Sequence, residues 1–364
     1  MRSVPRIMWI CDRAKERGGV ACALYDLYPA LSRCACEITF VAPRNASFPR
    51  LEALGATIHK VLPRFPMARG YVWSLLSFLP ALQAAIRIKP DILVADHTNA
   101  FLLTLFLKVV RYPAKAVYRN HGAGFLIYRP RLARFALAHV DHVITVSQPE
   151  ADALKQLTNR PVTLVPNCLP AHCLAPRKPQ PIGALPQGPT IAYVGWLSRA
   201  KGIYDFMDLF KEIRKTIPCT QGIAIGRISL ERGSTDSSEE LLACMRASGV
   251  RYLGEMPRES LFRGVDFLLV SSSRESFGLT IIEAPFCGVI PIAYDSPGTH
   301  FLLDGVNECL IPNGKREQMA QAVLELWERP VRRSEIEKLL RERFLRDFGE
   351  DLIATKLIAA FQNS

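Results

Sequence analysis

Residues 271–300 read Ser-Ser-Ser-Arg-Glu275-Ser-Phe-Gly278-Leu-Thr-Ile-Ile-Glu283-Ala-Pro-Phe-Cys-Gly288-Val-Ile-Pro291-Ile-Ala-Tyr-Asp-Ser-Pro-Gly298-Thr-His. The apolar run 265–270 before them predicts a buried strand, and the run 289–293 predicts another. A turn with Gly278 and an apolar helix fill the space between. The stretch therefore predicts one βαβ unit, with Glu275 in the turn and Glu283 about two helical turns further on.

Such units bind ligands outside the carboxyl ends of their strands, where helix N-termini and free backbone N–H groups face a crevice. Backbone amides suit phosphate groups, whereas Glu275 and Glu283 can accept charge-assisted hydrogen bonds from paired hydroxyl groups. The stretch therefore indicates a polyhydroxylated ligand that also carries phosphate.

The rest of the chain also alternates between predicted strands and predicted helices. Its length predicts two domains of ordinary size. Apolar runs predict strands at 6–11, 37–41, 92–96, 116–118, 142–146 and 163–165, with helices between them. Residues 169–189 hold six prolines, which is typical of a linker, and a second alternating series follows. We expect an α/β fold with two doubly wound, Rossmann-like domains facing across a cleft. The expected segments are domains at 1–170 and 190–345, a linker at 171–189, and a helix at 346–364 that crosses back to the first domain.

The whole excess of positive charge lies in the first half of the chain. Residues 1–170 hold 22 Lys and Arg against 10 Asp and Glu, whereas residues 171–364 hold 24 of each. This asymmetry indicates an anionic partner for one half only. No motif supports nucleic acid, whereas basic residues beside apolar side chains, as in Trp73–Phe78 and Phe125–Arg134, favour an anionic membrane surface.

The cysteines and the apolar segments indicate a cytoplasmic protein. The ten cysteines are scattered and none forms Cys-x-x-Cys, which is typical of reduced thiols. The N-terminus shows no signal peptide, and the apolar segments 71–88 and 100–110 are interrupted or too short to span a bilayer. We expect a protein that is soluble or peripheral at the inner face of the plasma membrane.

The sequence of residues 275–293 resembles the donor-site signature of retaining glycosyltransferases of the GT-B fold, family 4. Further motifs occur in that family's order, so that the resemblance covers nearly the whole chain. They are Gly18-Gly19-Val20, Asn120-His121-Gly122, Val143–Ser147, Val165-Pro-Asn167, Gly195 with Lys201-Gly202, and Asp304-Gly-Val-Asn307.

The resemblance implies a donor site in the second domain. It assigns Glu283 to the ribose hydroxyls of a nucleotide-sugar and Glu275 to hydroxyls of the transferred sugar. Lys201 would offset the charge of the leaving diphosphate. The remaining donor-side residues would be Gly19, Gly195, Gly278 and the amides of Leu279 and Thr280.

The chain departs from the family pattern at Trp196, where the family usually has an arginine. Arg199, in the same loop, could supply the missing guanidinium, and Trp196 would pack in the core.

On the acceptor side, His121 matches the family's histidine that contacts the transferred sugar. His97, Gly18 and Arg17 are further candidates on this side.

The resemblance implies front-face transfer of a sugar to a glycan or lipid-linked acceptor, in envelope, capsule or exopolysaccharide biosynthesis. The sequence has no Asp-x-Asp and no cluster with metal-ligand spacing, so we expect neither a metal nor another cofactor. Two alternatives stay open: a GT-B nucleotide-sugar epimerase or hydrolase, and a degenerate, non-catalytic glycosyltransferase subunit.

Overall fold

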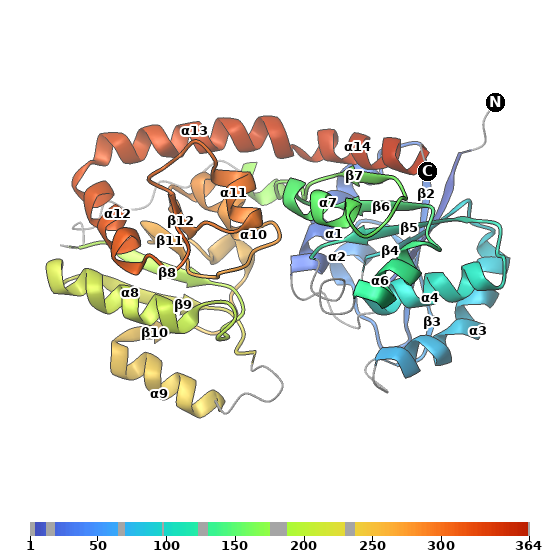
Figure 1. Ribbon diagram of the computed structural model, residues 1–364, viewed down its shortest axis with the longest axis horizontal. Helices are drawn as coiled ribbons and strands as arrows, with labels where there is room; N and C mark the ends of the chain where they lie inside the picture. Colours follow the sequence, from blue (N-terminus) through green and yellow to red (C-terminus); the bar gives the residue numbers. More distant parts are fainter. Residues whose placement is uncertain are drawn as a thin grey trace. The chain divides into compact units, whose positions relative to one another are not determined.

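The computed structural model describes residues 4–11, 19–64, 70–96, 98–122, 130–174, 188–229 and 237–362. The chain divides into two compact units: unit 1 is Met1–Cys168 with Phe348–Ser364, and unit 2 is Leu169–Asp347. Each unit is a parallel sheet covered by helices, which confirms the α/β, doubly wound fold (Figure 1). Of the expected linker 171–189, residues 175–187 lie outside the described part of the chain.

The sheet of unit 1 has seven parallel strands in the order β3-β2-β1-β4-β5-β6-β7. The strands are β1 (Arg6–Ile10), β2 (Glu37–Pro43), β3 (Thr57–Leu62), β4 (Ile92–Ala95), β5 (Lys115–Asn120), β6 (His142–Thr145) and β7 (Val162–Leu164). The helices are α1 (Gly19–Leu31), α2 (Pro49–Ala53), α3 (Gly70–Ile88), α4 (Thr98–Val109), α6 (Pro130–Leu137), α7 (Gln148–Lys155) and α14 (Glu350–Gln362).

Alternating side chains of β1 show how this sheet buries both faces. Ile7 and Trp9 belong to a core cluster with residues of α1 and α14, whereas Met8 and Ile10 belong to one with residues of α3, α4 and α6. A strand that is apolar at every position is typical of a parallel sheet covered on both sides. The C-terminal helix α14 therefore completes the core of unit 1.

The sequence did not predict the edge strand β3. Its residues Thr57-Ile-His-Lys-Val-Leu62 are mostly half-exposed, and the polar pair His59-Lys60 interrupts the apolar run. Edge strands are buried less than central ones, so their hydrophobic signal is weaker.

Unit 2 has six parallel strands in the order β10-β9-β8-β11-β12-β13. The strands are β8 (Thr190–Val194), β9 (Gln221–Ile225), β10 (Val250–Tyr252), β11 (Phe267–Val270), β12 (Ile290–Tyr294) and β13 (Leu310–Ile311). The α-helices are α8 (Ile203–Thr216), α9 (Ser238–Ser248), α10 (Leu279–Glu283), α11 (Pro297–Leu303), α12 (Arg316–Glu328) and α13 (Pro330–Phe348). The 3₁₀ helices are η1 (Ala171–Leu174), η2 (Arg258–Ser260) and η3 (Ala284–Cys287).

Both sheets reverse their strand order beside their first strand. In unit 1 the reversal lies between β1 and β4, and in unit 2 it lies between β8 and β11. Open parallel sheets bind ligands at such a reversal, beyond the carboxyl ends of the strands. In unit 2 this position belongs to two loops, residues 195–202 after β8 and residues 271–278 after β11.

Candidate functional site

The loop 195–202 holds Lys201 close to the end of β8. The hydroxyl oxygen of Tyr193, on β8, lies 2.6 Å from the carbonyl oxygen of Trp196 and 3.1 Å from that of Lys201. Burial, and then the charge of Glu275, raise the pKa of Tyr193, so this hydroxyl stays a donor at neutral pH. Ser271 donates a further hydrogen bond of 2.7 Å to the carbonyl of Gly202. The loop is therefore fixed to both strands of the switch point.

Glu275 is held in place by the first turn of α11. Its backbone N–H donates to the hydroxyl oxygen of Ser296 at 3.2 Å, and its carbonyl accepts from the N–H of Gly298 at 2.8 Å. A Cβ atom on Gly298 would lie 2.6 Å from the backbone of Glu275, Ser276 and Phe277, so only glycine allows this approach. Sequence reasoning did not single out this support, although Ser-Pro-Gly at 296–298 is a helix-start signal.

The two loops bring Lys201 and Glu275 together. The ammonium group of Lys201 donates a hydrogen bond of 2.8 Å to Oε1 of Glu275. The side chains are 38% and 17% exposed, so both remain accessible from solvent. A cation and a carboxylate thus stand side by side at the switch point of unit 2.

Gly278 begins the short helix α10. Its φ of +102° is a conformation that side chains rarely adopt, which explains a glycine in this turn. Leu279 and Thr280 form the first turn, where backbone N–H groups have no acceptor within the helix. The expected single helix at 279–287 is in fact the five-residue α10 followed by the 3₁₀ helix η3.

Glu283 ends α10 and is 1% exposed. Its Oε1 accepts a hydrogen bond of 2.5 Å from the guanidinium of Arg258, the first residue of η2. Its Oε2 lies 3.9 Å from Nε2 of His172, on η1. Neither Arg258 nor His172 carries a signal in the sequence that connects it with Glu283, since both are distant along the chain.

Trp196 and Arg199 lie in the loop after β8, where the chain departs from the family pattern. The expectation that Trp196 packs in the core is wrong, because the side chain is 49% exposed. It follows the last residue of β8 by two positions, beyond the covered part of the sheet. The guanidinium carbon of Arg199 lies 4.3 Å from the ring centroid of Tyr204, on α8, in a cation–π contact.

In unit 1, His121 belongs to a buried cluster around Asp96, at the end of β4. Nε2 of His121 and the guanidinium of Arg119 lie 3.7 and 3.9 Å from the carboxylate, and Trp9 donates a hydrogen bond of 2.9 Å to it. Burial on its own raises the pKa of Asp96, but the contacts with His121, Arg119 and Trp9 outweigh it and lower the pKa. Asp96 is therefore a buried anion that faces His121.

Gly18, Arg17 and His97 lie outside the described residues. Gly19 is the first residue of α1, and Gly195 directly follows β8. Of the predicted site residues, the described part of the chain thus groups Lys201 with Glu275.

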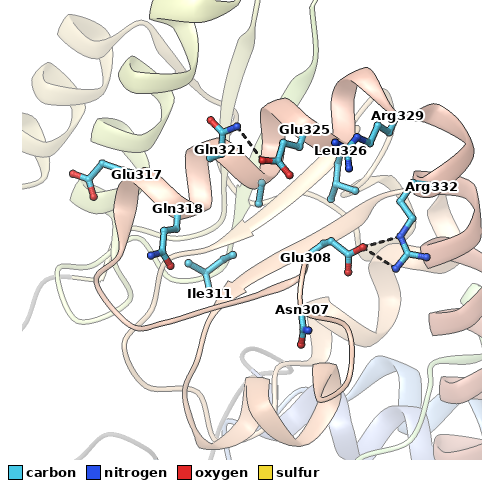
Figure 2. Close-up of a pocket in the computed structure, with 11 residues that line it drawn as sticks. Asn307, Glu308, Ile311, Glu317, Gln318, Gln321, Glu325, Leu326, Arg329 and Arg332 are labelled. Atoms are coloured by element: carbon cyan, nitrogen blue, oxygen red, sulfur yellow. Dashed lines mark hydrogen bonds and ion pairs between the residues drawn. The ribbon is translucent and has the colours of Figure 1, made fainter.

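A cavity of about 550 Å³ lies elsewhere in unit 2, along α12 and the edge strand β13 (Figure 2). Two hydrogen bonds link residues of its lining: Arg332 donates to Glu308, and Gln321 donates to Glu325. It contains none of the predicted site residues. Within the described residues no cluster of His, Cys, Asp and Glu is arranged to hold a metal ion. The helices that the structure describes include none long and apolar enough to cross a membrane.

Two protein-family models match this chain. Residues 17–171 match Glycosyltransferase Family 4, and residues 188–329 match Glycosyl transferases group 1. A D-inositol 3-phosphate glycosyltransferase from Kribbella flavida is 31% identical over 118 residues, which are 31% of this chain and 28% of the relative. A trehalose synthase from Pyrococcus horikoshii is 25% identical over 177 residues, 45% of this chain and 41% of the relative. These matches span less than half of each relative.

Solved structures resemble the chain over almost its full length. The Anabaena protein Alr3699/HepE, in complex with UDP and glucose, has a TM-score of 0.80 and 20% identity, covering 99% of this chain and 100% of its own. Sucrose-phosphate synthase from Thermosynechococcus elongatus has a TM-score of 0.80 and 18% identity, covering 99% and 98%. Likeness at this level of identity establishes the two-domain fold.

Proposed function

This chain belongs to the GT-B glycosyltransferases, and we propose that it is a retaining, family 4 enzyme with a nucleotide-sugar donor. Unit 2 would bind the donor, and unit 1 a glycan or lipid-linked acceptor. The observation that carries this proposal is the pairing of Lys201 with Glu275 at the switch point of unit 2, beside the turn of Gly278.

The site chemistry suits a sugar diphosphate. Lys201 supplies a cation for the diphosphate that leaves, and Glu275 supplies acceptors for hydroxyl groups of the transferred sugar. When the donor binds, each of the two side chains exchanges its present partner for a group of the ligand. The N–H groups of the first turn of α10 add donors for phosphate oxygens.

In unit 1, His121 would contact the transferred sugar. The buried Asp96, 3.7 Å from Nε2 of His121, would favour a proton on that nitrogen through its charge. We assign the anomeric retention and the front-face mechanism to this arrangement by analogy with the family.

The reaction is proposed to need no metal, because Lys201 with Arg199 provides positive charge where the diphosphate departs. Full activity after exhaustive treatment with EDTA is the expected result. Loss of turnover that Mg²⁺ or Mn²⁺ restores would contradict it.

The exposed face of α3 supports the proposal that the enzyme binds its acceptor at a membrane surface. Its exposed apolar side chains recur at helical spacing and form one stripe, while the opposite face packs into the core. The stripe consists of Val72, Leu75, Leu76, Leu79 and Ile86.

Exposed arginines lie on two helices that pack against the same core cluster: Arg87 near the end of α3, and Arg131 and Arg134 on α6. Apolar side chains with arginines beside them suit the headgroup region of an anionic bilayer. We therefore propose that unit 1 binds the inner face of the plasma membrane, where envelope, capsule or exopolysaccharide precursors are assembled.

Two measurements test this function. A thermal-shift panel of nucleoside diphosphates and nucleotide sugars identifies the donor, since a bound ligand raises stability by mass action. UDP and UDP-glucose enter it first, because the similar Anabaena protein binds UDP. Anomeric analysis of the product by NMR then tests retention.

The same measurements separate the alternatives. Release of free sugar or of an epimer without acceptor would indicate a hydrolase or an epimerase. Donor binding without any turnover, over a panel of lipid extracts, would indicate a degenerate subunit.

A further inference from the structure

The carboxylate of Glu283 is buried and already has a cationic partner. Arg258 donates to Oε1, and His172 approaches Oε2, so that the two oxygens face different elements of unit 2. The side chain of Glu283 is 2% exposed and that of Arg258 is 13% exposed. The pair is thus shielded from solvent, unlike the pair of Lys201 and Glu275.

A buried carboxylate without a cation is strongly unfavourable, because desolvation costs more than neutral hydrogen bonds return. The ion pair with Arg258 offsets part of this cost and favours the charged form of Glu283. A planar guanidinium also fixes the direction of the carboxylate better than an ammonium group does.

A carboxylate can accept from more than one donor at a time. An ionised carboxylate offers about four acceptor positions, two on each oxygen. The hydrogen bond from Arg258 uses one position on Oε1. The two vicinal hydroxyl groups of a ribose would share this carboxylate with Arg258, each needing one acceptor position beside the one that Arg258 uses.

We propose that Arg258, assisted by His172, is a positioning residue that holds Glu283 ionised and aimed at the ribose of the donor nucleotide. Arg258 thereby sets the preference of the site for ribonucleotides over 2′-deoxyribonucleotides. This inference rests on the proposed function, since it requires a nucleotide in unit 2.

The experiment compares the full-length protein with Arg258→Ala and Arg258→Lys. Dissociation constants are measured by calorimetry for UDP, GDP and ADP and for their 2′-deoxy counterparts. The unaltered protein is expected to prefer the ribonucleotide by about 10-fold or more, as a site that hydrogen-bonds a hydroxyl group does.

In Arg258→Ala this preference is expected to fall to within about 2-fold of unity, because Glu283 loses its orientation. Affinity for the 2′-deoxynucleotide should change little. Arg258→Lys keeps the charge without the planar fork and should retain part of the preference. Arg263→Ala, an exposed arginine of the same segment, is the matched control and should keep all of it.

Two results would overturn the inference. A preference unchanged in both Arg258 variants would show that Glu283 needs no positioning by Arg258. Tighter ribonucleotide binding in Arg258→Ala would show that Arg258 competes with the ribose for Glu283. Failure of the unaltered protein to bind any nucleotide would instead reject the proposed function together with this inference.

Discussion

Nζ of Lys201 donates a hydrogen bond of 2.8 Å to Oε1 of Glu275, across 74 residues of sequence and at the switch point of unit 2. In the proposed function, Lys201 leaves this pair to neutralise the departing diphosphate. Lys201→Ala is therefore expected to lower kcat about 10²-fold or more, as the loss of a transition-state charge stabiliser does. Steady-state kinetics with the identified donor measure the effect.

Lys211→Ala is the matched control, because Lys211 lies exposed on α8 and pairs only with Asp208 among the described residues. Its kcat should equal that of the unaltered protein. A Lys201→Ala enzyme that retains full kcat would remove Lys201 from the reaction.

Arg199 is the residue that we expect to replace the arginine lost at Trp196. It now stacks on Tyr204, and it must leave that ring to reach a phosphate group. Arg199→Ala should lower kcat about 10²-fold with a smaller effect on acceptor KM. Tyr204→Leu, which removes the stacking partner but keeps Arg199, should retain most of the turnover. Equal turnover for Arg199→Ala and the unaltered enzyme would mean that another cation serves the diphosphate.

Gly298 permits the close contact between α11 and the loop of Glu275. Gly298→Ala would place a Cβ atom 2.6 Å from the backbone of residues 275–277, so the loop must shift. Overpacking of this kind costs about 1–3 kcal/mol of stability. The expected result is a lower melting temperature together with weaker nucleotide-sugar binding.

Gly314→Ala serves as the comparison, since Gly314 also needs a positive φ, of +76°, but has open space around its Cβ. This variant should lose stability without losing affinity for the donor. Equal loss of affinity in both variants would show that general destabilisation, not the Glu275 loop, weakens binding.

The sequence predicts the two Rossmann-like domains because buried parallel strands are apolar at every position and stand out along the chain. It predicts Lys201, Glu275 and Glu283 as site residues because they match sequence motifs of the family. The pairing of Glu283 with Arg258 has no such signal, since it depends on how η2 folds over α10. Trp196 was misjudged because hydrophobicity alone does not distinguish a strand from the loop just after it. The support that α11 gives to the Glu275 loop depends on the close approach of Gly298 to the backbone of that loop, and no sequence motif predicts this contact.

Asp96 is expected to contribute stability that depends on pH. Asp96→Asn would leave the fully buried guanidinium of Arg119 without its anion, which costs about 3–5 kcal/mol. The native carboxyl has a lowered pKa, so its contribution is complete above the unfolded-state value of about 3.9 and is lost as the pH falls through the lower folded value. Urea unfolding should therefore separate the two proteins at pH 7, and the difference should begin to shrink below about pH 4 and vanish below the folded pKa of Asp96.

Asp152→Asn is the control for this prediction, since Asp152 is exposed on α7. It should change stability by less than about 1 kcal/mol at pH 7, as the loss of a surface ion pair does. A difference between Asp96→Asn and the unaltered protein that does not shrink as the pH falls below about 4 would show that packing, not charge, is the contribution of Asp96.

The apolar stripe on α3 predicts how the protein binds vesicles with anionic lipid. Leu75 and Leu79 are 61% and 59% exposed, whereas Trp73 is buried and donates to the carbonyl of Pro63. Trp73 therefore does not belong to the exposed stripe, and Phe125 lies outside the described residues. The double change Leu75→Glu with Leu79→Glu should release the protein in a flotation assay and leave nucleotide binding intact. Trp73→Ala should lower the melting temperature instead.

The exposed arginines of α6 should make this binding sensitive to salt. Arg131→Glu with Arg134→Glu should weaken it by on the order of 1 kcal/mol for each charge near the surface, and most strongly at low ionic strength. Val331→Glu, at an apolar residue of unit 2 that is 73% exposed, is the matched control and should float like the unaltered protein. Equal flotation with neutral and anionic vesicles at low salt would rule out an electrostatic contribution to vesicle binding. No flotation with either would reject the membrane and point to a soluble, polyanionic acceptor for unit 1.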